Sequence, residues 1–332
     1  MTKMHYEQDA DISVLDNQTV AILGYGNQGR AQALNLRDSG VRVIVGSIRD
    51  ESWEQACRDG METVSLAEAA ARGDILLLLL PDEIQREVYE RDIAPHLRAG
   101  QALGFGHGYN IRYKLIRPPA DIDVIMIAPR MIGVNVRNAF VAGGGVPAYV
   151  AVAQDATGRA LARALAIAKG IGATRAGVIE CTFELETDLD LWTEQGFWPL
   201  VMKLFVQGYE FLVENGFPPE MAALELYGSG EAAEIFHQMA RAGFFRQMSF
   251  HSHTSQYGTL TRQQRVDAAP LRAFMARAWE EIRDGRFARE WAAEQRNGYP
   301  VFEELKKKAF AHPLNETEEK LRAMLQAAGI SS

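Results

Sequence analysis

A glycine-rich turn lies near the start of the chain, in "AILGYGNQGRAQALNL" at residues 21–36. It has the spacing G-x-G-x-x-G, follows an apolar run and opens an amphipathic stretch. Such a turn between a strand and a helix lets the backbone approach the pyrophosphate of a dinucleotide at the positive helix N-terminus. The alternative is a purely structural turn. We predict a dinucleotide site, whose candidate residues in this turn are Gly24, Tyr25, Gly26, Asn27, Gln28 and Gly29.

The end of the second apolar run, "VIVGSIRDESWEQA", bears on which dinucleotide is used. NAD sites place a carboxylate there for the ribose hydroxyls, whereas NADP sites use arginine and hydroxyl groups for the 2′-phosphate. Arg49 and Ser52 suit a phosphate, although Asp50 and Glu51 would repel one. We predict NADPH, with NADH and an unrelated solvated loop as alternatives. Pro81, at the end of a later apolar run, completes the candidate cofactor set.

Two carboxylates point to a metal. Asp190 and Glu194 are four residues apart in a helical pattern, so they are expected on one face of a helix. Oxygen ligands of this kind suit Mg²⁺. The preceding residues Glu184, Glu186 and Asp188 are acidic as well, which is equally typical of a solvated face.

A histidine stands in the turn "GFGHGYN", where a predicted strand ends. Ligands of open α/β sheets bind at such strand ends. There, His107 could relay a proton near neutral pH. The alternative is a histidine that only caps the loop.

The elements that must position these residues are short apolar runs alternating with amphipathic stretches. This alternation predicts a doubly wound, parallel α/β sheet over residues 1–182. Beyond about residue 183 the strand pattern gives way to helical patterns, which predict an all-helical domain over 183–328. The expected strands lie at 19–26, 41–47, 74–81, 102–108, 123–129 and 147–153.

Composition limits the class of protein. The chain of 332 residues is 47% hydrophobic and 23% charged, with a net charge of −8, which argues against nucleic acid as a partner. It has no apolar run of 18 residues and a polar N-terminus, so neither a membrane span nor a signal peptide is expected. Two distant cysteines, Cys57 and Cys181, fit a reducing cytoplasm.

Several longer motifs resemble ketol-acid reductoisomerases of the short, class I-like form. The likeness runs from about residue 5 to residue 324. It is carried by "GYGNQGRAQALNLRDSG", "PDEIQREVYERDIAPHLRAGQAL", "GFGHGYNI", "AKGIGATRAGVIECTF", "ETDLDLWTEQ", "IRDGRFAREW" and "HPLNETEEKLRAM".

The resemblance implies an N-terminal Rossmann domain and a knotted helical domain that dimerises. It also implies a two-magnesium, NAD(P)H-dependent reaction, in which an acetohydroxy acid undergoes alkyl migration and hydride then reduces the resulting 2-keto acid. The metal-bridging aspartate and its glutamate partner fall on Asp190 and Glu194, and the active-site histidine falls on His107.

The chain departs from the family pattern on the substrate side. Arg130, in "APRMIGVNVR", stands where the family has a lysine that helps the migration step, and a larger planar guanidinium is no conservative replacement. The family's smaller residues after Glu194 become Phe197, Trp198 and Pro199. On the cofactor side, Arg30 replaces a histidine.

The partner-supplied part of the family site is altered too. Glu225 matches the first of two substrate- and metal-binding glutamates, but Ser229 stands at the second position. Glu231 takes that role only if Gly228 and Gly230 break the helix. The family's substrate serine falls on Ser252, whereas the neighbouring His251 and His253 are read as loop residues rather than metal ligands.

Three functions remain open. The first is an NAD(P)H-dependent reductase that reduces a C=O or C=N group of a small polar molecule, with migration weakened or lost, as in secondary metabolism. The second is a ketol-acid reductoisomerase of branched-chain amino-acid biosynthesis with tolerated substitutions. The third is a cofactor-binding sensor without catalysis. Each is a fold-level inference until the site is known.

Overall fold

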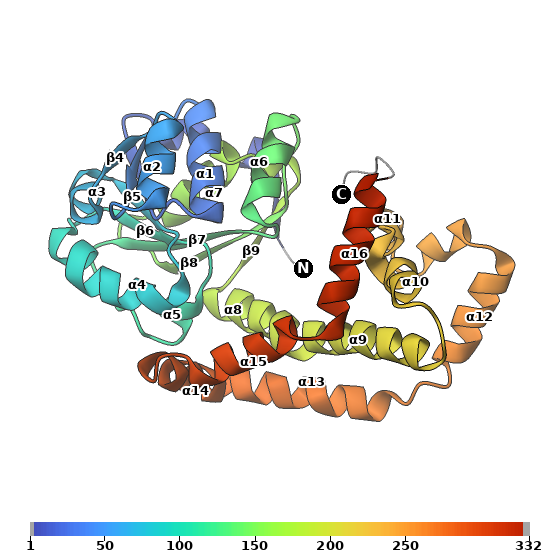
Figure 1. The fold of residues 1–332 in the computed structure, drawn as a ribbon. Coiled ribbons are helices and arrows are strands. Elements are labelled where there is room, and N and C mark those ends of the chain that lie inside the picture. Colours follow the sequence, from blue (N-terminus) through green and yellow to red (C-terminus); the bar gives the residue numbers. More distant parts are fainter. Residues whose placement is uncertain (1–2, 328–332) are drawn as a thin grey trace. The chain divides into compact units, whose positions relative to one another are not determined.

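The structure is a computed structural model that describes residues 3–327 (Figure 1). The chain folds into two compact units, which divide between Asp190 and Leu191. The first unit contains the sheet, and the second contains only helices.

One nine-stranded sheet forms the centre of the first unit, in the order β1-β9-β8-β7-β6-β5-β2-β3-β4. All six strands expected from the apolar runs are present. The bounds are β1 Met4–His5, β2 Thr19–Leu23, β3 Arg42–Gly46, β4 Glu62–Val64, β5 Ile75–Leu78, β6 Ala102–Phe105, β7 Asp123–Pro129, β8 Ala148–Gln154 and β9 Val178–Cys181.

The doubly wound sheet is present as predicted, but its parallel pairing does not extend to two of its strand pairs. Strands β2 to β7 pair in parallel, but β8 runs antiparallel to β7, and β1 runs antiparallel to β9. The reason at β8 lies in its connection. The chain leaves β7 through helix α6 (Gly133–Val141), which packs against α1, and enters β8 beside the end of β7, where Ala148 pairs with Pro129. A parallel partner would have needed a crossover over the sheet face.

Helices cover both faces of the sheet (Figure 1). Alternate residues of β2 divide between two cores, Val20 and Ile22 in one and Ala21 and Leu23 in the other, as the two-residue period of a strand requires. The helices of this unit are α1 Asn27–Asp38, α2 Glu51–Arg58, α3 Leu66–Arg72, α4 Asp82–Val88, α5 Tyr109–Arg112, α6 Gly133–Val141 and α7 Ala160–Gly170. Helix α8, Phe183–Trp192, begins in this unit and ends in the second.

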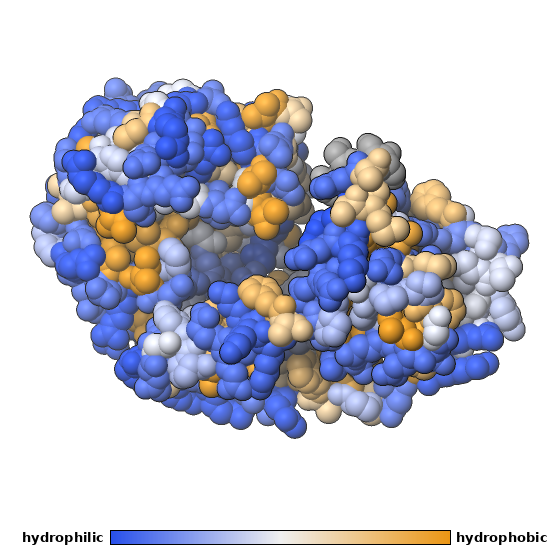
Figure 2. All heavy atoms as spheres, in the orientation of Figure 1, coloured by the Kyte–Doolittle hydropathy of each residue, from blue (hydrophilic) through white to orange (hydrophobic). Residues whose placement is uncertain are grey.

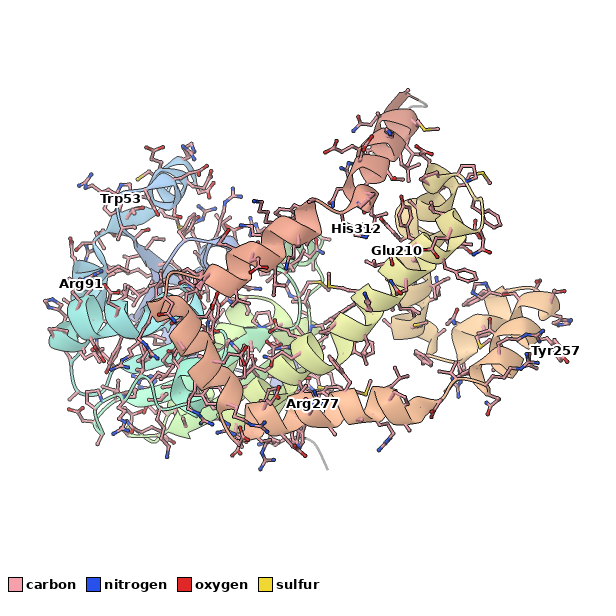
Figure 3. All side chains as sticks on the ribbon, turned by 60° about the horizontal axis from the view of Figure 1, so that its bottom comes forward. Trp53, Arg91, Glu210, Tyr257, Arg277 and His312 are labelled. Atoms are coloured by element: carbon pink, nitrogen blue, oxygen red, sulfur yellow. The ribbon has the colours of Figure 1, made fainter. Side chains whose placement is uncertain are left out.

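The second unit is helical, as predicted. Its helices are α9 Trp198–Glu214, α10 Pro219–Ala223, α11 Glu231–Ala242, α12 His253–Gln263, α13 Ala268–Arg283, α14 Arg286–Arg296, α15 Pro300–Phe310 and α16 Pro313–Ala327. The residue His312, between α15 and α16, lies 3.2 Å from Glu210 of α9 (Figure 3). Among the described residues, no helix is both long and apolar enough to cross a membrane.

Two π-helical turns interrupt stretches after residue 183 whose sequence has a helical pattern. The first, Thr193–Phe197, separates α8 from α9, and the second, Leu224–Gly228, follows α10. Each turn adds a residue to the helical repeat and so rotates the side chains that follow.

Candidate active site at the carboxyl edge of the sheet

Chemistry-bearing residues follow five adjacent strands of the parallel part of the sheet. In sheet order, β3 leads to Arg49, β2 to the glycine turn, β5 to Asp82, β6 to His107 and β7 to Arg130. Because β2 to β7 are parallel, their carboxyl ends share one edge. The chain order reverses between β2 and β5, which is where open α/β sheets bind ligands.

The glycine turn has the geometry of a phosphate-binding turn. Gly26 is the N-cap of α1, and a Cβ added there would meet nothing within 4 Å, so the space in front of the helix is open. A Cβ at Gly29 would lie 2.0 Å from the carbonyl oxygen of Gly24, so only glycine allows α1 to start this close to β2. Backbone N–H groups at an uncovered helix N-terminus favour an anion.

Three predicted cofactor residues of this turn use their side chains inside the protein. The Tyr25 hydroxyl donates to Asp59 at 3.0 Å, and Arg30 donates to the same carboxylate. Asn27 accepts a bond from the Val134 amide, and the Gln28 side chain donates to the Met131 carbonyl at 2.7 Å. These bonds tie the side chains of Tyr25, Asn27 and Gln28 to the protein, so the backbone of the turn is the part that we expect to face a cofactor.

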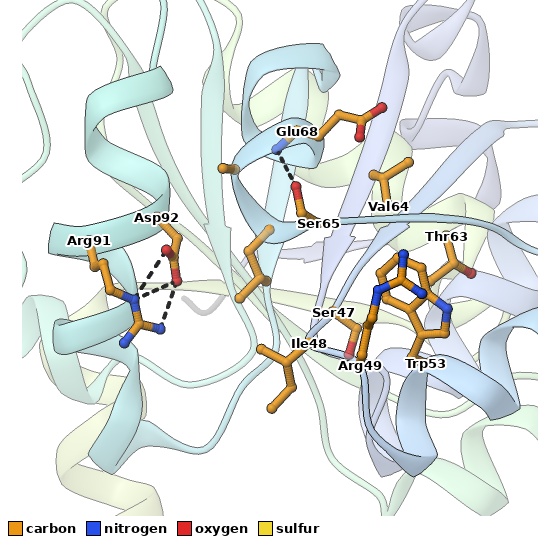
Figure 4. Close-up of a pocket in the computed structure, with 12 residues that line it drawn as sticks. Ser47, Ile48, Arg49, Trp53, Thr63, Val64, Ser65, Glu68, Arg91 and Asp92 are labelled. Carbon is orange, nitrogen blue, oxygen red and sulfur yellow. Dashed lines mark hydrogen bonds and ion pairs between the residues drawn. The ribbon is translucent and has the colours of Figure 1, made fainter.

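A cavity of about 570 Å³ lies beyond the end of β3 (Figure 4). The Arg49 guanidinium lies over the Trp53 ring at 4.8 Å, which holds it at the cavity wall. The hydroxyl groups that line the cavity belong to Ser47, Thr63 and Ser65, whereas the predicted Ser52 is not among its lining residues. Asp50 caps α2 by accepting from the Trp53 amide, so its carboxylate has a structural role.

This cavity makes Arg49 the residue that we expect to set cofactor preference. Replacing Arg49 with Ala should raise KM for NADPH by about 10- to 100-fold and leave KM for NADH nearly unchanged, because only NADPH has a 2′-phosphate for the guanidinium to bind. Steady-state kinetics with both cofactors measure this. Arg58→Ala, which removes an exposed arginine at the end of the neighbouring helix α2, is the matched control. Equal losses for both cofactors would contradict the assignment.

His107 is held between two carboxylates. Its Nδ1 lies 2.6 Å from Asp82, and its Nε2 lies 3.6 Å from Asp190. Burial by itself lowers the pKa of His107, but the hydrogen bond and charge of Asp82, with smaller contributions from Glu186 and Asp190, outweigh it and raise the pKa to about 9. The imidazole is therefore protonated at neutral pH. Within the described part of the chain, its buried Nε2 has no hydrogen-bond partner.

Arg130 completes this group of charged side chains. Its guanidinium donates to Glu186 at 3.2 Å and also to Asp190, and it stacks over the Tyr149 ring at 5.1 Å. Glu186 is buried, and its second oxygen accepts from the Gly108 amide at 3.0 Å. We call His107, Arg130, Glu186 and Asp190 the charged cluster.

The alternative interpretation, that the acidic residues 184–188 form a solvated face, is therefore wrong for Glu186 and Asp188. The side chains of Glu186 and Asp188 are only 1% and 5% exposed, because Arg130 and Gly108 bind the first and Arg112 binds the second. Glu184 is exposed, as that alternative expected.

Sequence reasoning also missed Asp82. Asp82 is the first residue of α4 and follows the apolar run at 74–81 directly, so the sequence could have predicted its position at the end of a strand. Its pairing with His107 depends on the adjacency of β5 and β6.

The remaining predicted site residues lie in the second unit. Glu194 is exposed in the π-helical turn Thr193–Phe197, and its pairing with Asp190 through a metal stays a prediction. Phe197 and Trp198 are also exposed. The helix does break between Glu225 and Glu231, since Gly230 adopts φ +85° and α11 begins at Glu231. Ser252 caps α12 by accepting from the Ser255 amide.

Three members of the charged cluster could together offer ligand atoms to a magnesium ion. His107, Glu186 and Asp190 each offer a ligand atom, and these atoms lie within 4.8 Å of one another. The four carboxylate oxygens, however, already face N–H groups. Glu186 accepts from Arg130 and Gly108, and Asp190 accepts from Arg130 and faces His107. A divalent cation prefers several free oxygens, so the cluster in this arrangement does not fit one.

The fold and the site place the chain among the NAD(P)H-dependent oxidoreductases with a Rossmann domain. Residues 14–177 match the family model of the acetohydroxy acid isomeroreductase NADPH-binding domain, and residues 183–327 match that of the ketol-acid reductoisomerase C-terminal domain. The chain belongs to the ketol-acid reductoisomerase family.

Individual relatives agree with this assignment. A ketol-acid reductoisomerase (NADP(+)) of Pyrobaculum calidifontis is 46% identical over 329 residues, which cover 98% of this chain and 99% of the relative. The structure of an NADH-preferring ketol-acid reductoisomerase from an uncultured archaeon superposes with a TM-score of 0.93 at 39% identity, covering 97% of this chain and 98% of that one. A semialdehyde dehydrogenase NAD-binding protein from Cupriavidus necator, at 18% identity, 80% and 99% coverage and TM-score 0.61, shares the fold alone.

Proposed function

We propose that this chain catalyses the ketol-acid reductoisomerase reaction, with NADPH as the reductant. An acetohydroxy acid would rearrange to a 2-keto acid, which hydride from the nicotinamide would then reduce to a 2,3-dihydroxy acid. The observation that carries the proposal is similarity over the whole length of the chain to a ketol-acid reductoisomerase (NADP(+)). The glycine turn and His107 at one edge of the sheet support the reductive half of the reaction.

The chain's own residues fit the reductive step. The nicotinamide would deliver hydride to the carbonyl carbon of the 2-keto acid, and the carbonyl oxygen would take a proton. The His107 imidazolium has its Nδ1 bound by Asp82 and its buried Nε2 without a partner among the described residues, so Nε2 can donate that proton. No step is assigned to a metal ion here, because the charged cluster does not fit one.

A second candidate is a reductase without alkyl migration, acting on a C=O or C=N group of a small polar molecule. The pairing of Arg130 with Glu186 and Asp190 supports this second candidate. In this pairing a guanidinium occupies the carboxylates, whereas the family reaction uses magnesium ions. The comparisons favour the first candidate over this one.

Two substrates separate these functions. Purified protein is mixed with NADPH and Mg²⁺, and with either acetolactate or the rearranged 2-keto acid. A ketol-acid reductoisomerase oxidises NADPH with both and restores growth of an isoleucine/valine auxotroph. Turnover of the 2-keto acid alone would replace the first candidate by the second. Tight NADPH binding with no turnover on any carbonyl or imine would contradict both and favour the sensor.

We also propose that the chain forms a homodimer. Apolar surface is exposed on the helical unit (Figure 2). The exposed apolar side chains of α9 include Met202 at 67%, Leu204 at 73% and Phe211 at 64%. Exposed apolar surface of this extent is typical of an association surface. Light scattering is expected to give twice the chain mass of 36.8 kDa or a higher multiple. A monomer at micromolar concentration would contradict this proposal.

A further inference from the structure

The misfit between the charged cluster and a divalent cation centres on Arg130, which binds both carboxylates. One guanidinium nitrogen, NH1, donates to Glu186 at 3.2 Å, and the other, NH2, donates to Asp190. These bonds use two of the five N–H donors of the group. Arg130 thus bridges two carboxylates and still carries donors and a permanent positive charge.

Several contacts fix Arg130 in this position. Its backbone amide donates to the Pro147 carbonyl at 2.8 Å, and its guanidinium stacks on Tyr149, so both ends of the residue are held at the start of β8. Its carboxylate partners are held as well. Glu186 is buried and accepts from Gly108, and His107 lies against Asp190.

The loop that follows Arg130 is fastened to the glycine turn. Gln28 donates to the Met131 carbonyl, and the Val134 amide donates to the Asn27 side chain. A Cβ at Gly133 would lie 2.0 Å from the Asn27 carbonyl oxygen, so the loop and the turn touch backbone to backbone. The loop that begins at Arg130 is therefore attached to the same turn that would hold the cofactor pyrophosphate.

We propose that Arg130 acts as a fixed cation of the active site, in the place of a divalent metal ion, so that the reduction of the 2-keto acid needs no divalent cation. The two electrons pass as hydride from the nicotinamide to the carbonyl carbon. The carbonyl π bond breaks toward oxygen, which takes a proton, and the guanidinium stabilises the negative charge that develops there. The inference rests on the proposed function, because it concerns the reductive half of that reaction.

The test compares metal dependence in the full-length protein. Wild-type protein stripped with EDTA is assayed with NADPH and the rearranged 2-keto acid, with and without Mg²⁺. The expected rates agree within about twofold, since Arg130 supplies a permanent charge. In Arg130→Lys, a point charge cannot bridge both carboxylates, and the EDTA rate should fall by about tenfold or more, with Mg²⁺ restoring part of it. Arg137→Lys, whose guanidinium pairs with Asn35 and Asp38, is the matched control and should behave as wild type.

A binding readout tests the inference independently of turnover. Mn²⁺ titration followed by electron paramagnetic resonance should show weaker binding to wild type than to Arg130→Lys and Arg130→Met, because both variants free carboxylate oxygens. If wild-type reduction stops in EDTA and returns with Mg²⁺, or if wild type binds Mn²⁺ as tightly as the variants, the inference is wrong. Absence of any turnover with the 2-keto acid would instead contradict the proposed function, and the Mn²⁺ titration would still decide the inference.

Discussion

Replacement of His107 with Asn is expected to lower kcat for NADPH-dependent reduction by about 10²- to 10⁴-fold, the range typical of a lost general acid. His107, the proposed proton donor, lies beside Asp190 and has a buried Nε2. Binding of NADPH, measured by fluorescence titration, should change little, because His107 follows β6 and the glycine turn follows β2. Asparagine retains a polar side chain of similar reach.

Two further variants make this prediction specific. His96→Asn changes an exposed histidine of the same unit and should leave kcat unchanged. Wild-type activity should persist below the His107 pKa of about 9 and decline as the pH rises through it, because the acid form is needed. In Asp82→Asn that decline should move to lower pH, since the carboxylate that raises the pKa is gone. An unchanged kcat in His107→Asn would remove His107 from the mechanism.

Replacement of Asp123 with Ala is expected to cost about 3–5 kcal/mol of folding free energy, the usual cost of breaking a buried ion pair. Asp123, the first residue of β7, is fully buried. Its carboxylate accepts from the Ala156 and Thr157 amides, from the Thr157 hydroxyl and, at 2.8 Å, from Arg163. The variant would leave the buried Arg163 guanidinium without this partner, and β7 is the strand that leads to Arg130.

Denaturant unfolding followed by circular dichroism measures this loss as a lower midpoint of the transition of the first unit. Asp121→Ala, two residues earlier and exposed, is the matched control and should stay within about 0.5 kcal/mol of wild type. A loss below about 1 kcal/mol for Asp123→Ala would mean that the structure around Arg163 relaxes enough to hydrate the charge.

Much of the fold could be predicted from local sequence patterns. The glycine turn, the expected strands and the helical character of the second unit follow from motif spacing and hydrophobic period, which depend on neighbours in sequence. The direction of a strand does not follow from these patterns. The composition of β8 fits a buried strand in either direction, and its direction is set by the way the chain returns beside β7. The π-helical turn at Thr193–Phe197 likewise leaves no mark in the hydrophobic period.

The sequence predicted where the site residues lie in the fold better than it predicted which residues they contact. His107 and Arg130 could be placed at strand ends, because each follows an apolar run. Their partners come from far along the chain, since Glu186 lies 56 residues after Arg130, and an acidic run gives no sign of which carboxylate will be buried. The pairing of Arg130 with carboxylates of α8 therefore follows from the packing of the fold and not from the sequence pattern.

Hydride transfer from NADPH to the carbonyl carbon of a 2-keto acid can be followed with an isotope label. The protein is incubated with NADPH deuterated at the transferable C4 position and the rearranged 2-keto acid, and the product is analysed by mass spectrometry. We expect a 2,3-dihydroxy acid that carries one deuterium on the former carbonyl carbon. A product without deuterium, or no product while NADPH remains bound, would contradict it.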